Sequence, residues 1–298
     1  MKKKISILMF FLITISICSN VIVLGKESCI PEEVSVETMD VKDGYGKQCK
    51  DITPDAHFAI AYDAKNKKIL YEKNAFRNVP MASTTKILTA LVAINYSDLD
   101  EEVTISKTAA SIRGSKVGFR AGEKVTMREL LFGLMYKSGN DAAIAIAEHI
   151  GGSIENFSIL MNDFARMLGL KDSNFQSPHG LDSQMHFSSA YDLAVLMSKA
   201  MEEPFFREIS GTKEVGAEKY NFTRSYSNIN KMLWRLPNAN GGKTGYTGQA
   251  GKCLVSSVDH NGRNIIIVVL NCPTRWEATE RVYEYVKTQL FLKSKVLY

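Results

Sequence analysis

Short apolar runs bounded by turn-forming residues occur near both ends of the chain, and such runs are typical of β-strands. The runs 57–62 and 68–71 flank the turn 63–66 and predict a β-hairpin. The runs 252–258 and 264–271 flank the sequence Asp-His-Asn-Gly and predict a second hairpin, because Asn-Gly is a strong hairpin signal. Strands are therefore expected from both ends of the sequence.

The middle of the chain has a different period, with apolar residues recurring every three to four positions, as in helices that bury one face. Thr126, Ser153 and either Ser188 or Ser189 stand directly before such segments and are the predicted N-caps. After Pro204 the helical period is lost. The sequence thus predicts several amphipathic helices between the two groups of strands.

A last amphipathic helix, predicted over 276–292, follows the second hairpin. Strands at both ends with helices between and after them predict one sheet whose faces are covered by helices. The expected fold class is α/β of the α+β type. It combines an antiparallel sheet covered by helices with an all-helical lobe inserted in the middle of the chain.

The N-terminus differs in composition from the rest of the chain and predicts export. Three lysines at 2–4 precede an apolar run at 5–18, which is the pattern of a secretory signal peptide. Residues 1–25 are therefore expected to be a signal peptide; left uncleaved, they would anchor the protein in a membrane. A lead-in segment, 26–52, and one domain, 53–298, follow.

Charge and cysteine content exclude several classes of function. With a net charge of +5 and no block of Lys and Arg, the chain has no electrostatic footprint for nucleic acid. Cys29 and Cys49 bracket the acidic lead-in, and outside the cytosol they would either form a disulfide or remain thiols. Cys253 and Cys272 fall in strand-like runs and are expected to be small core residues. No group of Cys and His has the spacing of zinc ligands.

One candidate for chemistry lies where a Pro-containing turn meets an apolar, helix-forming run. Ser83 falls in the first turn of the predicted helix, and Lys86 follows one turn later on the same face. An amine with a lowered pKa can activate a serine hydroxyl, and a helix N-terminus favours negative charge on the oxygen. Alone, the pair is more typical of a helix cap followed by a surface lysine, so the interpretation needs further motifs.

Two further motifs supply that support. Ser138-Gly139-Asn140 interrupts the helical middle of the chain, and Lys243-Thr244-Gly245 follows two glycines before the second predicted hairpin. With Ser83-x-x-Lys86 they occur in the order found in penicillin-binding proteins and class A β-lactamases. From about residue 56 to 292 the chain resembles the low-molecular-mass penicillin-binding proteins, which are serine-type D-alanyl-D-alanine carboxypeptidases.

The resemblance implies a chemical role for each motif. Ser83 would attack the carbonyl between two D-alanines and form an acyl-enzyme, while Lys86 takes its proton. The pKa of Lys86 would have to be lowered for this step, by partial burial and by the second cation, Lys243. Ser138 would relay a proton to the leaving amine, and Asn140 would orient either the substrate or Lys86.

The resemblance also implies how substrate is bound. The backbone N–H groups of Ser83 and Tyr246 would form the oxyanion hole, and Lys243 and Thr244, with Gly245 beside them, would hold the terminal carboxylate. A water would then hydrolyse the acyl-enzyme, with no metal or organic cofactor. The expected partners are peptidoglycan stem peptides as substrates and β-lactams as inhibitors, in the extracytoplasmic cell envelope.

Some positions depart from the family pattern or take no part in it. Family members often carry an arginine that helps bind the terminal carboxylate, and the sequence places Ala278 there, with Arg275 and Arg281 as nearby substitutes. His179 and His186 lie in family-like surroundings and are interpreted as structural. The C-terminal β-rich domain of many members is not expected, because the sequence ends soon after the last predicted helix.

Three other functions fit parts of this pattern. A D,D-endopeptidase cutting crosslinks would use the same chemistry on another leaving group, and the sequence does not separate the two. A β-lactamase shares the three motifs, but class A enzymes add a Glu-x-x-Leu-Asn string that does not occur here. A catalytically silent peptidoglycan-binding module would not need the intact Ser83 and Lys86.

Overall fold

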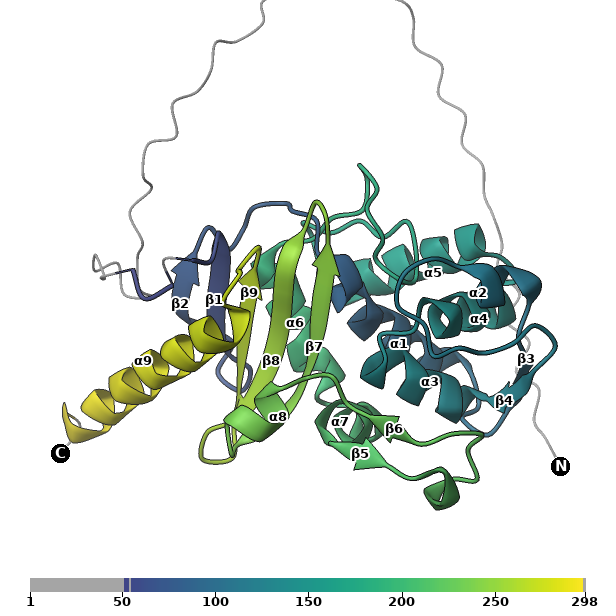
Figure 1. The fold of residues 1–298 in the computed structure, drawn as a ribbon. Coiled ribbons are helices and arrows are strands. Elements are labelled where there is room, and N and C mark those ends of the chain that lie inside the picture. The colour runs from purple at the N-terminus through teal and green to yellow at the C-terminus, as the bar shows by residue number, and fades with distance from the viewer. Residues whose placement is uncertain (1–50, 54, 297–298) are drawn as a thin grey trace, which may run out of the picture. The chain divides into compact units, whose positions relative to one another are not determined.

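The computed structural model describes residues 51–53 and 55–296, and these are built around a five-stranded antiparallel sheet (Figure 1). Its strands are β1 (Phe58–Asp63), β2 (Lys68–Lys73), β7 (Ala239–Thr247), β8 (Gly251–Asp259) and β9 (Asn264–Leu270). Their order across the sheet is β2-β1-β9-β8-β7, so both predicted hairpins form and β7 is an edge strand. Because β1 pairs with β9, strands from both ends of the domain share one sheet.

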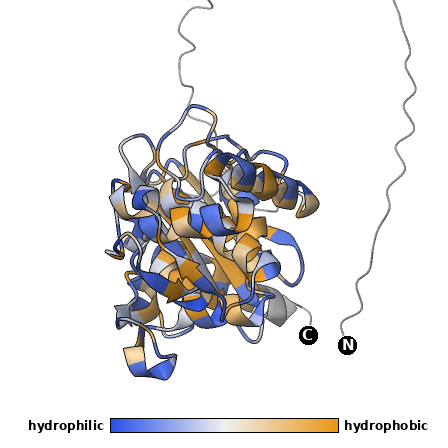
Figure 2. Ribbon diagram, turned by 90° about the vertical axis from the view of Figure 1, so that its right-hand side faces the viewer, coloured by the Kyte–Doolittle hydropathy of each residue, from blue (hydrophilic) through white to orange (hydrophobic). Residues whose placement is uncertain are grey.

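Both faces of this sheet are covered by helices, since alternate residues of its strands enter different cores. In β9, Ile266 packs on the side of α6 (Ala190–Ala200), whereas Ile265 and Ile267 pack on the side of α9 (Arg275–Val296). In Figure 2 the strands in the interior are coloured mainly orange, for hydrophobic residues, and helices surround them. The predicted class, an antiparallel sheet covered by helices, is confirmed.

Helices and two short antiparallel ladders, β3-β4 and β5-β6, fill the chain between β2 and β7, so the inserted lobe is mainly helical and not all-helical as predicted. They are η1 (Ala82–Thr85), α1 (Lys86–Tyr96), β3 (Glu102–Thr104), α2 (Lys107–Ser111), β4 (Lys124–Thr126), α3 (Met127–Tyr136), α4 (Asn140–Gly151), α5 (Ile154–Met167), α6, α7 (Pro204–Gly211), β5 (Glu214–Val215), η2 (Ala217–Lys219), β6 (Tyr226–Ser227) and α8 (Met232–Arg235). The predicted N-caps are confirmed at Thr126, Ser153 and Ser189, whose side-chain oxygens accept the N–H three residues further on.

Helix α7 is a feature that sequence reasoning missed. No helical period was seen after Pro204, yet α7 begins at that residue. Pro204 occupies the first turn, where a missing N–H costs no hydrogen bond. Over eight residues only Phe206, Ile209 and Ser210 are buried. Two apolar positions are too few to produce a recognisable period.

Helix α1 follows directly on the turn that holds Ser83, begins with Lys86 of the first motif and is largely buried in the lobe. Its first eight residues, Lys86–Ala93, are all buried. It contacts α3, α4, α5 and α6, as expected of a helix that is apolar on every side. The turn η1 directly before it contacts β7 and β8, so the first motif lies at the junction of lobe and sheet.

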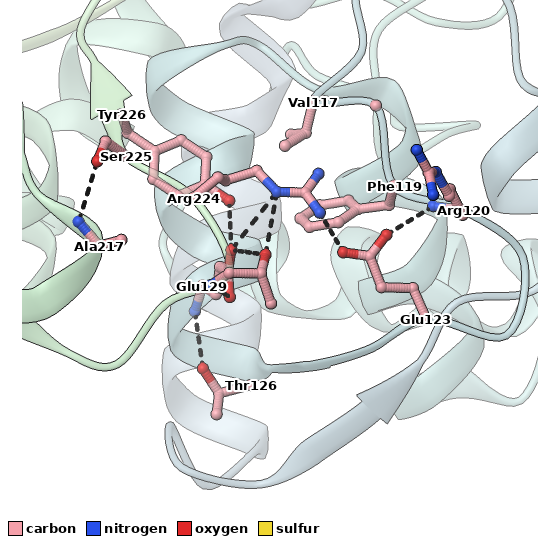
Figure 3. Close-up of polar contacts among 12 residues, drawn as sticks. Val117, Phe119, Arg120, Glu123, Thr126, Glu129, Ala217, Arg224, Ser225 and Tyr226 are labelled. Carbon is pink, nitrogen blue, oxygen red and sulfur yellow. Dashed lines mark hydrogen bonds and ion pairs between the residues drawn. The ribbon is translucent and has the colours of Figure 1, made fainter.

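A buried carboxylate fastens the segment before β6 to the lobe (Figure 3). Glu129 of α3 accepts hydrogen bonds from the Thr223 backbone N–H at 3.0 Å and from Tyr226 Oη at 2.9 Å. The guanidinium of Arg224 lies 4.4 Å from the centre of the Phe119 ring. Buried charge is tolerated when it is hydrogen-bonded in this way. The cluster therefore also holds the loop to which Phe119 belongs, which covers the second motif.

The remaining predictions concern the N-terminal segment and the cysteines. The predicted signal peptide and the Cys29–Cys49 pair lie outside the described residues. Within the described ranges, no helix combines the length and the apolar character needed to cross a membrane. Cys253 and Cys272 are buried core residues, as predicted, and they belong to the cores on opposite faces of the sheet.

Candidate active site

The first motif forms a hydrogen-bonded pair at the start of α1. Lys86 Nζ lies 2.9 Å from Ser83 Oγ and 2.8 Å from Asn140 Oδ1, so the amine joins the first motif to the second. Its third contact is the backbone carbonyl oxygen of His179, at 2.7 Å. Lys86 is fully buried, whereas Ser83 is partly exposed. The predicted reach between the hydroxyl and the amine is confirmed, with Ser83 in the turn η1 rather than in α1 itself.

The backbone before Ser83 is strained and closely packed. Ala82 has φ +50°, a region that costs a residue with a Cβ roughly 1–2 kcal/mol. A Cβ added at Gly180 would lie 2.0 Å from the Ala82 carbonyl oxygen. On the β7 side, a Cβ added at Gly245 would lie 3.1 Å from Ser83 N. Two glycines therefore allow neighbouring segments to close around the turn that holds Ser83.

The second and third motifs are joined by another lysine. Lys243 Nζ lies 2.9 Å from Ser138 Oγ and 2.8 Å from the Thr244 carbonyl oxygen. Ser138, like Ala82, has a positive φ, +54°. Lys243 and Thr244 are buried, whereas Tyr246, further along β7, is 68% exposed. The structure thus brings the three motifs together at one place between the lobe and the edge strand of the sheet.

Burial controls the charge of the two lysines. Burial, together with the positive charge of Lys243, holds the pKa of Lys86 well below its usual value, as predicted. Burial and the nearby Arg275 lower the pKa of Lys243 to about 7. Burial therefore favours the neutral form of both amines, and for Lys86 the facing charge of Lys243 adds to this effect. In its neutral form, Lys86 would present a base 2.9 Å from the Ser83 hydroxyl.

A carboxylate that sequence reasoning missed fixes the second motif. Asp141 is fully buried and accepts the backbone N–H groups of residues 117–119 at distances of 2.8 to 3.2 Å. Asn140 Nδ2 donates to the Arg113 carbonyl oxygen at 2.7 Å. The loop thereby orients the amide so that its Oδ1 faces Lys86. The sequence signal that could have identified this role is an acidic residue, Asp141, in the first turn of the helix directly after the second motif.

The two histidines lie behind the first motif. One ring nitrogen of His186 lies 2.8 Å from Thr85 Oγ1, and Nδ1 of His179 accepts the N–H of Leu181 at 3.1 Å. Burial lowers the pKa of His186 to about 4 and that of His179 to about 3, so both rings are neutral. The group of His179 that reaches Lys86 is its backbone carbonyl. Within the described residues, no cluster of His, Cys, Asp and Glu is arranged to hold a metal ion.

Among the arginines considered from the sequence, Arg275 is the one at the site. Its Nη1 donates to the carbonyl oxygens of Gly245 at 2.8 Å and Cys253 at 3.1 Å. Arg281 instead donates to a carbonyl near the start of the domain. Ala278 is buried. The positive charge behind the third motif therefore comes from the first residue of α9.

Comparison with known proteins agrees with this geometry. The family model for D-alanyl-D-alanine carboxypeptidase, peptidase family S11, matches residues 46–274. The D-alanyl-D-alanine carboxypeptidase DacF of Bacillus subtilis is 35% identical over 243 residues, which cover 80% of this chain and 62% of DacF. This chain also spans 57% of DacC of Escherichia coli, and thus about three fifths of these curated relatives.

Two solved structures extend the similarity to the fold. The D-alanyl-D-alanine carboxypeptidase of Mycobacterium tuberculosis H37Rv has a TM-score of 0.72 and 32% identity, covering 77% of this chain and 90% of that chain. The Streptomyces K15 DD-transpeptidase has a TM-score of 0.74 and 31% identity, covering 79% of this chain and 99% of that chain. Both similarities extend over more than three quarters of this chain.

Proposed function

This chain belongs to the D-alanyl-D-alanine carboxypeptidase family of serine peptidases, and from that premise we propose that it removes the terminal D-alanine from peptidoglycan stem peptides through an acyl-enzyme on Ser83. The observation that carries the proposal is the fully buried amine of Lys86, 2.9 Å from the Ser83 hydroxyl. A serine needs a base to become a nucleophile, and a lysine serves as that base only when it is neutral. The lowered pKa of Lys86 supports this form.

In the proposed acylation step, Lys86 takes the proton of Ser83 as the serine oxygen bonds to the carbonyl carbon between the two D-alanines. Asn140 orients the amine through its Oδ1. When the C–N bond breaks, the leaving nitrogen needs a proton. Ser138 would relay it, giving its hydroxyl proton to the nitrogen and receiving one from the protonated Lys243, which donates to its Oγ. Both proton transfers then use side chains already joined by hydrogen bonds.

Substrate binding is assigned to the edge strand β7. The backbone N–H groups of Ser83 and Tyr246 would stabilise the negative charge on the attacked carbonyl oxygen. Lys243 and Thr244 would hold the terminal carboxylate of the peptide. Arg275 supports this role, because its positive charge lies directly behind the same strand.

β-Lactams would enter the same site as inhibitors. Such a molecule presents a carboxylate to Lys243 and a strained amide to Ser83, so acylation should proceed as with a peptide. The difference comes afterwards, because D-alanine diffuses away while the opened β-lactam ring stays tethered to the acyl group. Water is then excluded, and the adduct should persist.

Two measurements on the purified protein test this function. We expect multiple-turnover release of D-alanine from a peptide ending in D-Ala-D-Ala, followed by mass spectrometry, and slow release of penicilloate after stoichiometric labelling with penicillin. Each tenfold decrease in deacylation rate corresponds to about 1.4 kcal/mol of barrier. Rapid penicillin hydrolysis without D-alanine release would instead identify a β-lactamase. Absence of both labelling and release would identify a silent binding module.

Transfer to an amine is a second candidate for the fate of the acyl-enzyme, favoured by the similarity to the Streptomyces K15 DD-transpeptidase. The acylation chemistry is the same, and only the acceptor differs. Adding an amino acid acceptor to the peptide reaction would reveal this activity as a new amide product. A crosslinked peptide dimer as substrate would in the same way reveal endopeptidase activity.

The site of action that fits this function is the extracytoplasmic cell envelope. The support is the predicted signal peptide at 1–25 and the proposed peptidoglycan substrate. If the apolar segment stays uncleaved, it would hold the protein at the membrane surface next to its substrate.

Gly180→Ala is expected to weaken this site, because Gly180 has φ +84° and no space for a Cβ beside Ala82. The loop must then move, taking the His179 carbonyl away from Lys86. We expect penicillin labelling to slow at least about tenfold and Tm to fall by a few degrees. The control is Gly262→Ala, which also has a positive φ, +75°, but open space around its Cβ. Gly262→Ala should lose some stability but label at the wild-type rate. Equal labelling rates for Gly180→Ala and Gly262→Ala would contradict the role of the contact between the His179 carbonyl and Lys86.

A further inference from the structure

An open cavity of about 690 Å³ lies beside the catalytic residues, on the side of the helical lobe. Arg113 and His179 are part of its wall. The backbone carbonyl oxygen of Arg113 accepts a hydrogen bond from Asn140 at 2.7 Å, and that of His179 accepts one from Lys86 at 2.7 Å. Arg113 and His179 therefore border both the cavity and the site of Ser83.

Two polar groups of this wall have hydrogen-bonding capacity that the fold does not use. Ser158 of α5 is 8% exposed, and its Oγ has no hydrogen-bond partner among the described residues. Because Nδ1 of His179 accepts the N–H of Leu181, the neutral ring carries its proton on Nε2. In the described part of the chain, no atom accepts from that nitrogen. A buried hydroxyl without a partner is unfavourable, so a polar ligand would improve the site.

Side chains of opposite charge line the same cavity without neutralising one another. Arg113 contributes a positive charge, and Glu155 and Asp182 contribute negative charges. Among the described residues, neither Arg113 nor Glu155 forms an ion pair, and Asp182 accepts the backbone N–H of Gln249 at 3.3 Å. A ligand that carries both an anionic and a cationic group would satisfy both signs. A ligand with one charge would leave the other sign unpaired.

The place of the cavity suits the residue that precedes the two D-alanines of a stem peptide. Neighbouring Cα atoms are about 3.8 Å apart, so this residue lies within one or two residues of the carbonyl attacked by Ser83. We propose that the cavity is the subsite for its side chain and selects one that ends in both an ammonium group and a carboxylate. This inference rests on the proposed function and defines its substrate class.

Each end of such a side chain has a partner in the cavity. The Arg113 guanidinium can bind a carboxylate through two parallel hydrogen bonds. The Ser158 hydroxyl and the His179 Nε2–H add neutral donors on the same wall. Glu155 and Asp182 provide acceptors for the ammonium group. A diamino dicarboxylic acid matches this set, whereas a lysine side chain offers only the ammonium group.

Three peptides that differ only in the residue before D-Ala-D-Ala test the subsite. That residue is meso-2,6-diaminopimelate, lysine or norleucine, and kcat/KM is measured from D-alanine release. We expect the value for diaminopimelate to exceed that for lysine at least about tenfold, and the value for norleucine to be the lowest. Equal values for the three peptides would overturn the subsite while leaving the proposed function intact. No release from any of them would overturn both.

Substitutions in the cavity wall identify the residues that cause the preference among the three peptides. Arg113→Gln should bring the diaminopimelate-to-lysine ratio close to one, and Glu155→Gln should reduce the preference of both charged peptides over norleucine. Arg120→Gln is the matched control, since Arg120 is an exposed arginine of the same loop outside the cavity wall, and its ratios should equal those of the wild type. Ratios within one variant do not depend on how much active protein it contains. A diaminopimelate preference that survives Arg113→Gln would place the recognition elsewhere and overturn this assignment.

Discussion

Ser83→Ala is expected to abolish covalent labelling by penicillin and to lower D-alanine release at least about 1,000-fold, which corresponds to about 4 kcal/mol of barrier. The hydroxyl lies 2.9 Å from the buried amine that would deprotonate it. The other two partners of Lys86 are the side-chain oxygen of Asn140 and a backbone carbonyl oxygen, and neither is a nucleophile that can form an acyl-enzyme. Intact-protein mass spectrometry after incubation with penicillin measures the adduct.

The fold should survive this change, which separates a lost nucleophile from a lost structure. Lys86 keeps its hydrogen bonds to Asn140 and His179 when the Ser83 hydroxyl is removed. The loss of one hydrogen bond costs about 1 kcal/mol, or a few degrees of Tm. Ser97→Ala, at the other end of α1, is a matched control that should label normally. An adduct that persists in Ser83→Ala would place the nucleophile elsewhere.

Lys86→Met and Lys86→Arg are both expected to slow acylation at least about 100-fold, because neither side chain accepts a proton. Methionine fills a similar volume without a base, and arginine keeps its proton at all accessible pH values. In the wild type, acylation should slow as pH falls through the lowered pKa of Lys86, since protonation removes the base. The second-order rate of penicillin labelling, measured across pH, reports this dependence.

The two substitutions control for each other. Arginine is larger than the fully buried space that Lys86 occupies, so an inactive Lys86→Arg alone would not separate misfolding from a missing base. If Lys86→Met is inactive but keeps the wild-type Tm, the loss of acylation is due to the missing base and not to misfolding. Lys137→Met removes an exposed lysine next to the second motif and should keep the wild-type pH profile. Substantial acylation by either Lys86 variant would exclude this lysine as the base.

Local sequence patterns determined much of what could be predicted. Ser83 and Lys86 lie one turn apart, so their contact depends only on backbone geometry near the start of α1. The caps at Thr126 and Ser153 likewise act over three residues. The hairpin β8–β9 follows from its Asn-Gly turn. In each case the interacting groups are close in sequence, and residue type alone identifies them.

The remaining groups were beyond sequence reasoning because they act across long separations or through the main chain. The His179 carbonyl that binds Lys86 is 93 residues away and belongs to the backbone, so its residue type carries no signal. Arg275 reaches β7 only because α9 begins beside that strand. The cavity lined by Arg113 and Glu155 requires the packing of α5 against two loops. A single sequence contains no record of such contacts.

Burial of Lys243 also makes the free energy of unfolding depend on pH. In the unfolded chain a lysine has a pKa of about 10.4, whereas that of Lys243 is about 7 in the folded protein. The unfolded state therefore binds more protons between these values, and stability rises with pH across that window. At pH 7 and below the penalty is largest, on the order of 5 kcal/mol, which is comparable to the whole net stability of many domains.

A ligand carboxylate placed beside Lys243 would return part of this free energy, because it would favour the protonated amine. Without such a ligand, the folded protein bears the whole cost of burying this amine. Any ligand that places a carboxylate beside Lys243, whether substrate or β-lactam, would therefore raise the free energy of unfolding when it binds.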